Sequence, residues 1–243
     1  MDLNCDVGEG LSNDGLLMFY ISSANIACGY HAGDEDTMKR TVARAVGHEV
    51  AIGAHPGFAD KENFGRTEMH LSAEAIRELL SEQIFSLQTV AGTFGARIKH
   101  VKPHGALYNM SARDEQLAAI IAQTIYNIDP SLLLYGLSGS FSISEARKAG
   151  LQTVSEVFAD RTYQSNGSLT PRSQPGALIE TEEQSIQQVL QMINRQTVTS
   201  VSGEEVPIVA ETICLHGDGD HAVRFAKKIF NTLKENNIEI KSF

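Results

Sequence analysis

The stretch Asp2-Leu3-Asn4-Cys5-Asp6-Val7-Gly8-Glu9 joins a short strand to a polar segment that follows it without a break. Alternate side chains of a strand point to opposite faces, so Asn4 and Asp6 share one face while Cys5 lies on the other. A short apolar run followed by polar residues recurs along the chain. We expect strands at Asp2–Cys5, Ser23–Ala27, Val50–Ala54, Ile98–Lys102, Leu132–Tyr135, Thr153–Phe158 and Thr212–Leu215.

Patterns of helical period separate these strands. Apolar residues recur at every third or fourth position within residues 76–94, 117–128, 186–193 and 223–233. Thr181-Glu182-Glu183-Gln184 is typical of a capping box at the start of the third of these helices. Strands and helices in alternation predict a parallel sheet with crossover helices. Seven units without a change in composition favour one closed or nearly closed β/α barrel over residues 1–243. An open doubly wound sheet is the alternative, and periodicity alone does not separate the two.

Composition restricts the function further. The 243 residues carry 30 acidic and 20 basic side chains, a formal net charge of −10, so phosphate backbones and anionic lipid would repel the chain. Nucleic acid and membranes are therefore poor partners. Cys5, Cys28 and Cys214 are too few and too widely spaced for a disulfide framework, and the first residues lack the basic and apolar runs of a signal peptide. We expect a cytoplasmic protein.

Polar residues follow the strand ends. Because the carboxyl ends of parallel strands meet at one face, we expect these side chains to converge on an active site, flanked by ordered loops at 57–69 and 160–177. Four of the eight histidines belong to this set, which scattered surface histidines would not. The converging residues are Asp6, Glu9, His31, His55, Lys102, His104, Arg161, His216 and Asp218.

Some of these residues also have a structural interpretation. A capping or turn role for His31 or His55 is as well supported as direct chemistry. For Asp6 we favour a functional role, because burying a carboxylate without a partner costs free energy. His100 and His104 have the H-x3-H spacing of metal ligands on a helix, but a proline interrupts a predicted strand there, which makes the metal signal weak.

The remaining motifs argue against a nucleotide site. The chain has no G-x-x-x-x-G-K-[ST] sequence. Gly217-Asp218-Gly219-Asp220-His221-Ala222 fits G-x-G-x-x-A, but its two acidic residues would repel a pyrophosphate. Cys214 lies two residues before His216, so both side chains point to the same face of the strand and Cys214 could face the site. No neighbour is expected to lower the pKa of the Cys214 thiol. Three further histidines are interpreted as surface or capping residues: His48, His70 and His221.

Taken together, the strand-end motifs resemble the LamB/YcsF family, the A subunits of prokaryotic ATP-dependent 5-oxoprolinase. The motifs that carry the resemblance are Asp2-Leu3-Asn4-Cys5-Asp6-Val7-Gly8-Glu9, Ser23-Ala24-Asn25-Ile26-Ala27-Cys28-Gly29-Tyr30-His31-Ala32-Gly33-Asp34, Gly53-Ala54-His55-Pro56-Gly57, Val101-Lys102-Pro103-His104-Gly105-Ala106-Leu107-Tyr108-Asn109 and Ile213-Cys214-Leu215-His216-Gly217-Asp218. The resemblance implies a seven-stranded barrel related to glycoside hydrolases and carbohydrate deacetylases. It also implies that 5-oxoproline, ATP and water yield glutamate, ADP and phosphate, in a complex with B and C subunits.

That reaction needs particular groups. ATP, with Mg²⁺, would be a co-substrate, and we expect no tightly bound organic cofactor; self-association of the chain is a further option. Lys102 or Arg161 could supply a cation for the substrate carboxylate or a phosphoryl group, and His104 or His216 a general base for water. Asp6 or Glu9 could orient that base. Substrate-binding positions are expected at Asn4, Glu9, Asn25, His31, His55, Arg161 and Asp218.

Two other functions compete with this one. A metal-dependent hydrolase or carbohydrate deacetylase would use Asp6, His31 and His55 as ligands and leave coordination positions for an activated water. A non-catalytic binding or regulatory subunit would tolerate substitution of the convergent histidines. The sequence does not assign a metal.

Overall fold

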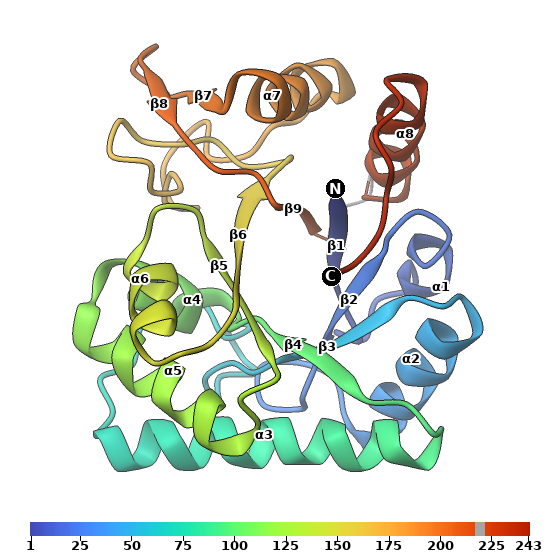
Figure 1. Cartoon of the computed structure of the whole chain (residues 1–243), viewed down its shortest axis with the longest axis vertical. Helices are drawn as coiled ribbons and strands as arrows, with labels where there is room; N and C mark the ends of the chain where they lie inside the picture. Colours follow the sequence, from blue (N-terminus) through green and yellow to red (C-terminus); the bar gives the residue numbers. More distant parts are fainter. Residues whose placement is uncertain (217–221) are drawn as a thin grey trace.

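Seven parallel strands close into a barrel in the computed structural model, which describes residues 1–216 and 222–243 (Figure 1). The predicted barrel is confirmed, and the open sheet is not formed. Two strands have the expected bounds, and the others differ by one or two residues at one or both ends. The strands, in barrel order, are β1 Asp2–Val7, β2 Ser23–Ala27, β3 Ala51–His55, β4 Ile98–Val101, β5 Leu133–Leu137, β6 Thr153–Phe158 and β9 Thr212–His216.

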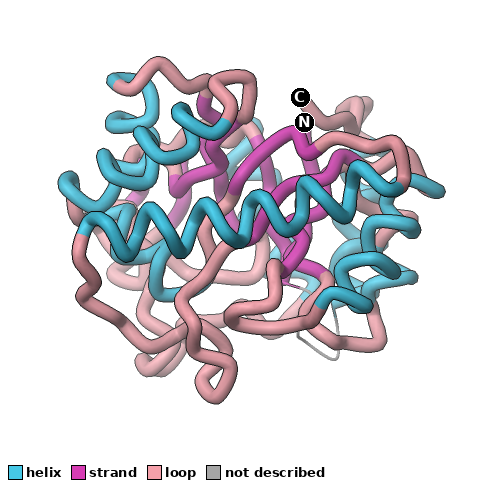
Figure 2. The backbone as a smooth tube through the Cα atoms, turned by 90° about the horizontal axis from the view of Figure 1, so that it is seen from below, coloured by secondary structure: helices cyan, strands magenta, loops and turns pink. Residues whose placement is uncertain are grey.

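Helices surround these strands on the outside, and the long helix α3 crosses the front of the barrel in Figure 2. The four predicted helical patterns correspond to α3 Ala73–Thr93, α5 Glu115–Ile128, α7 Glu182–Arg195 and α8 Ala222–Glu235. The Thr181 side chain caps α7 as expected, because its Oγ1 accepts a hydrogen bond from the Gln184 amide. The structure adds four helices that the periodicity did not single out: α1 Asp14–Leu17, α2 Glu35–Gly47, α4 Gly105–Arg113 and α6 Phe141–Lys148.

The barrel interior is polar. Along β1, Leu3, Cys5 and Val7 pack into the hydrophobic layer under the helices, whereas the alternate side chains point inward. Parallel pairing places equivalent positions of neighbouring strands in the same layer; Asp6, for example, pairs with Asn25 on one side and His216 on the other. The inward residues include Asp2, Asn4, Asp6, Ser23, Asn25, His100, Lys102, Tyr135, Glu156, Thr212 and Cys214, all of them buried.

Long connections gather at the carboxyl ends of the strands. Residues 57–69 and 160–177 contain no named helix or strand, as expected, and are held by internal hydrogen bonds. A short antiparallel hairpin, β7 Thr197–Thr199 with β8 Glu205–Pro207, lies between α7 and β9 and was not predicted. Within the described residues, no helix is both long and apolar enough to cross a bilayer.

Candidate active site

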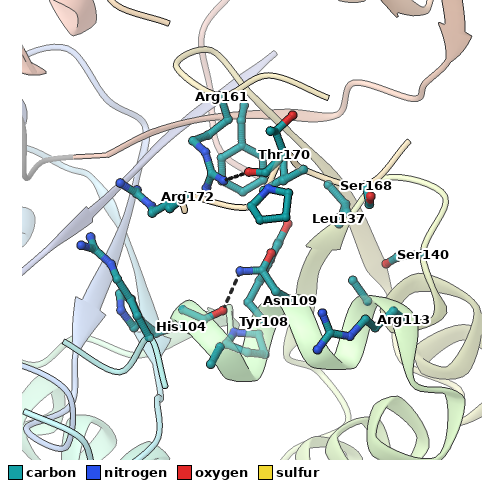
Figure 3. A pocket seen from close by; sticks show the side chains of 18 of the residues that line it. His104, Tyr108, Asn109, Arg113, Leu137, Ser140, Arg161, Ser168, Thr170 and Arg172 are labelled. Atoms are coloured by element: carbon teal, nitrogen blue, oxygen red, sulfur yellow. Dashed lines mark hydrogen bonds between the residues drawn. The ribbon is translucent and has the colours of Figure 1, made fainter. Parts of the chain in front are cut away.

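An open cavity of about 770 Å³ lies at the carboxyl ends of the strands. Its floor is formed by Asp6, Lys102 and His216 from inside the barrel, and its walls by the loops that follow β3 to β6. Figure 3 shows Arg161 and Arg172 on one side of the cavity and His104 on the other. Residues far apart in the sequence therefore meet at the face that the strand-end pattern predicts.

A buried charge cluster forms the floor. The Lys102 ammonium contacts Asp6 Oδ1 at 2.8 Å and Glu156 Oε1 at 2.9 Å, and it donates to Cys214 Sγ at 3.0 Å. Burial alone would lower the pKa of Lys102, but Asp6 and the other anionic neighbours outweigh burial and hold that pKa well above its usual value. Burial likewise opposes the charge on Asp6, yet His55 and Lys102 keep the pKa of Asp6 well below its usual range. The ammonium and Asp6 are thus both charged at neutral pH.

This arrangement gives Lys102 a role that the sequence did not predict. An ammonium has three N–H donors, and here all three directions lead to groups of the barrel itself. Lys102 borders the cavity, but its side chain is only 2% exposed and its charge is already neutralised. It is placed to fix the position of Asp6 rather than to reach out for a substrate anion.

His55 and His104 form a pair whose tautomers follow from main-chain contacts. A carbonyl oxygen can only accept, so His55 Nδ1 donates to the Lys102 carbonyl at 2.7 Å and His104 Nε2 donates to the Phe64 carbonyl at 2.9 Å. The other two nitrogens, His55 Nε2 and His104 Nδ1, lie 2.8 Å apart and would both carry lone pairs in neutral rings. A proton or another cation is therefore required between them.

His31 and Glu9 adjoin this pair. The His31 and His104 rings are stacked, with centroids 3.8 Å apart and planes 4° from parallel. Glu9 Oε1 lies 3.5 Å from both His31 Nε2 and His104 Nδ1. Burial, with the nearby charge of His55, lowers the pKa of His31 to about 3, and the same two causes hold the pKa of His104 well below its usual value. Both rings are neutral at physiological pH.

His216 is oriented differently, by a carboxylate at the end of the neighbouring strand. Its Nδ1 lies 2.9 Å from Asp160 Oδ2, which also accepts from the His216 main-chain amide at 3.0 Å. The ring packs on Phe158 with centroids 5.5 Å apart. With Nδ1 donating to Asp160, Nε2 keeps its lone pair and has no hydrogen-bond partner among the described residues. His216 borders the cavity, so this nitrogen has the properties of a general base.

The cavity wall is cationic although the chain is acidic. Apart from histidines, the charged side chains that line it are Arg66, Lys102, Arg113, Arg161 and Arg172 against Asp6 and Glu68. Arg113 is paired with Glu68 at 2.5 Å, and the buried Arg161 donates to the carbonyls of Thr170 and Ala177. Arg172 has no ion-pair partner in the described part of the chain. An excess of guanidinium groups in one cavity favours an anionic ligand.

Comparison with known proteins supports the expected resemblance. Residues 1–243 match the model of the LamB/YcsF family. The chain is 50% identical over 240 residues to two proteins from Haemophilus influenzae, strains PittEE and 86-028NP, each named as the A subunit of 5-oxoprolinase. The match covers 99% of this chain and 98% of each relative. This chain belongs to the LamB/YcsF family.

Solved structures resemble this LamB/YcsF protein along its whole length. The crystal structure of a lactam utilization protein from Thermus thermophilus aligns with a TM-score of 0.94 and 39% identity, and the alignment covers 100% of this chain and 99% of that one. A putative cellobiose-phosphate cleavage protein from Enterococcus faecalis V583 aligns with a TM-score of 0.62 at 15% identity, over 99% of this chain and 96% of that one. The second similarity concerns the fold alone.

The LamB/YcsF site contains most of the residues singled out from the sequence, at different depths. Asp6, His55, Lys102, His104, Arg161 and His216 border the cavity. Asn4 and Asn25 lie deeper, where Asn25 Nδ2 donates to both Asn4 Oδ1 and Asp6 Oδ1. His100 is also below the cavity floor, bonded to Asn25 Oδ1 at 2.8 Å, so the H-x3-H spacing does not form a metal pair with His104. Asp218, Asp220 and His221 lie outside the described residues.

Sequence reasoning missed Glu156, and it placed Asp160 at a strand end without giving it a role. Glu156 is fully buried in β6, and its position between Val154 and Phe158, on the same face of the strand, was a usable signal for an inward-facing carboxylate. Asp160 follows that strand and takes the orienting role that Asp6 or Glu9 was expected to have. Arg66, Arg113 and Arg172 were not predicted either. The sequence of a loop has no regular period, so it does not show which way a side chain points.

The ligand trio expected for a metal-dependent hydrolase is not the group that the fold brings closest together. Ligand atoms of Glu9, His31, His55 and His104 all lie within 4.8 Å of one another, whereas Asp6 groups with Cys214 and His216. Of the expected trio, Asp6 and His55 are in contact, with 3.3 Å between Asp6 Oδ2 and His55 Nε2. Asp6 Oδ1 already accepts from Lys102 and Asn25 at 2.8 Å each. His48 and His70 are exposed, in agreement with their interpretation as surface residues.

Proposed function

We propose that this chain is the A subunit of an ATP-dependent 5-oxoprolinase, which converts 5-oxoproline, ATP and water into glutamate, ADP and phosphate. Membership of the LamB/YcsF family and two relatives with that subunit name support the proposal. The observation that carries it is the cationic cavity with a histidine on its floor, His216, that a carboxylate orients. Such a cavity suits an anionic substrate attacked by water.

The role of ATP follows from the stability of the lactam. A five-membered lactam is an unstrained, resonance-stabilised amide, so water attacks its carbonyl carbon slowly. Transfer of a phosphoryl group to the lactam oxygen removes that resonance and makes the carbon a good electrophile. The activated lactam then carries a carboxylate and a phosphoryl group, both of which guanidinium groups bind well.

His216 is the residue best placed to activate water. Its Nε2 removes a proton from the water that attacks the activated carbon, while Asp160 holds the ring through Nδ1 and stabilises the imidazolium that forms. His104 is a weaker candidate for this step, because both of its ring nitrogens already have partners inside the protein. Collapse of the tetrahedral intermediate breaks the carbon–nitrogen bond, with the imidazolium returning its proton to the leaving nitrogen, and leaves the released carboxyl group as an acyl phosphate. A second water hydrolyses this acyl phosphate and gives glutamate and phosphate.

Arg172 and Arg66 are suited to bind the substrate anions. They come from the two long loops on either side of the cavity, at 160–177 and 57–69. Arg161 contributes positive charge, although its guanidinium is partly occupied by two carbonyl oxygens and burial lowers its pKa to about 10. The Asp6–Lys102–Glu156 cluster fixes the polar floor beneath the substrate.

We place the nucleotide site on the B and C partner subunits. The chain lacks a P-loop sequence, and its glycine-rich turn contains two acidic residues. The isolated chain should therefore neither hydrolyse ATP nor open 5-oxoproline at a useful rate, even with Mg²⁺.

The test measures ATP turnover and glutamate release by the purified chain, first alone and then with its B and C partners, with and without ATP. Glutamate release that needs every component and ATP supports the proposal. Robust ATP-coupled release by the chain alone would contradict the placement of the nucleotide site, and no release by the full set would contradict the function. ATP-independent hydrolysis of an acetylated sugar, abolished by chelation, would favour the deacetylase alternative.

A further inference from the structure

The space between His55 and His104 has the features of a cation site. Each ring donates one N–H to a main-chain carbonyl: His55 Nδ1 to that of Lys102 and His104 Nε2 to that of Phe64. When both rings are neutral, the two remaining nitrogens carry lone pairs directed into the same space, where His55 Nε2 also lies 3.3 Å from Asp6 Oδ2. Metal-binding histidines are oriented in this way, by a carbonyl or carboxylate on the nitrogen that does not bind the metal.

Two further donors reach the same space. Glu9 Oε1 lies 3.5 Å from His104 Nδ1 and from His31 Nε2, and ligand atoms of all four residues fall within 4.8 Å of one another. His31 is 1% exposed, and neither of its ring nitrogens makes a hydrogen bond within the described residues. A buried imidazole without a hydrogen bond is costly unless another ligand binds it.

The distances suit a transition-metal ion. Ligands about 2.1 Å from a tetrahedral ion stand about 3.4 Å apart, close to the two 3.5 Å separations seen here. The 2.8 Å separation between His55 Nε2 and His104 Nδ1 is shorter, so that pair must open by about 0.6 Å when an ion of this geometry binds.

We propose that Glu9, His55 and His104 bind one divalent transition-metal ion of the zinc class, with His31 as a fourth, adjustable ligand. An imidazole binds metal in the plane of its ring, and the parallel stack of His31 on His104 prevents both rings from meeting one ion without a rotation. His31 is therefore the ligand that turns or gives way to water. This site lies on the side of the cavity that carries His104, does not involve His216, and does not depend on the proposed reaction.

The test measures binding, not turnover. The purified full chain is treated with a chelator, dialysed, and titrated with Zn²⁺ by calorimetry and with Co²⁺ by visible absorption. We expect one ion per chain, with a cobalt spectrum of nitrogen and oxygen ligands and no thiolate band. Glu9→Gln should weaken binding at least about 10-fold, and His104→Gln at least about 100-fold.

Two control variants make the result specific. His70→Gln removes an exposed histidine outside the cluster and should leave the affinity unchanged. Cys214→Ser tests the other group of donors, with Asp6 and His216. Circular dichroism checks folding, and if His104→Gln does not fold, the isosteric Glu9→Gln variant decides. Less than one bound ion per chain, equal affinity in Glu9→Gln and the parent, or a thiolate band that Cys214→Ser removes would each overturn the proposal.

Discussion

Lys102 stays charged inside the barrel because of the groups that surround its ammonium. Its ammonium is held between the carboxylates of Asp6 and Glu156, which are themselves almost inaccessible to water. The desolvation of three charges is offset only while all three remain together. The Lys102 side chain therefore contributes to folding as well as to the site.

Lys102→Met should destabilise the protein by about 3–5 kcal/mol, because two carboxylates remain buried without their counter-ion. Urea denaturation at pH 7 measures this change. The double variant Lys102→Met, Glu156→Gln should recover part of the loss, since it removes one of the unpaired charges. A Lys102→Met chain as stable as the parent would show that water reaches the carboxylates and that the cluster is not structural.

The proposed base gives a prediction about catalysis rather than folding. His216→Gln should lower kcat for glutamate release by the assembled complex at least about 100-fold, the usual contribution of general-base catalysis, with little change in KM. Asp160→Asn should lower kcat less, because the ring remains but loses the carboxylate that orients it. Near-normal turnover of His216→Gln would assign the base to another residue. The matched control is His48→Gln, an exposed histidine at the C-terminal end of α2 that does not border the cavity.

At the scale of elements, the size of a side chain on one barrel strand is matched to the size of the side chain that it faces on the next strand. Gly53 of β3 faces His100 of β4, and a methyl group at position 53 would lie 2.0 Å from His100 Nε2. The pairing of these strands also shifts register beside Gly53. The missing side chain at Gly53 makes room for the imidazole inside the barrel.

Gly53→Ala should therefore destabilise the chain by about 1–3 kcal/mol through overpacking, despite the better strand propensity of alanine. Thermal and urea unfolding measure the effect. Gly53→Ala combined with His100→Ala should be less destabilised than the sum of the two single variants, because the smaller side chain removes the clash. Strict additivity would mean that the two positions do not touch.

At the scale of the whole molecule, buried neutral histidines make stability depend on pH. Burial, assisted by the charge of Lys102, lowers the pKa of His100 to about 3 from an unfolded value near 6.5. Below pH 6.5 the unfolded chain takes up a proton that the folded chain cannot. Stability is therefore complete above this pH and falls as the pH drops from 6.5 toward 3.

Between pH 7 and pH 5, His100 alone should cost about 2 kcal/mol of unfolding free energy. Urea denaturation at the two pH values, on the parent and on His100→Gln, isolates this contribution. A glutamine amide can keep the hydrogen bond that His100 donates to Asn25 and does not titrate in this range. Identical pH dependence in both chains would show that His100 is protonated in the folded state.

The barrel and the location of the site could be predicted from local patterns. Polar and apolar side chains alternate along Asp2–Val7, and similar patterns recur in later strands. This alternation depends only on the geometry of a strand and on which side chains avoid water. Alternating strands and helices limited the topology, and the strand-end rule brought His55, His104 and His216 to one cavity. These inferences hold because each requires only short-range periodicity and the direction of the chain.

The partners of each group were decided only in the tertiary structure. The sequence offered Asp6 or Glu9 to orient a base, but Asp160 reaches His216, since pairing of β6 with β9 places their ends side by side. It likewise indicated Lys102 as a free cation, whereas Glu156, from a strand 54 residues away, neutralises it. Hydrogen bonds and ion pairs act over about 3 Å, and closure of the barrel selects which distant side chains come within that range.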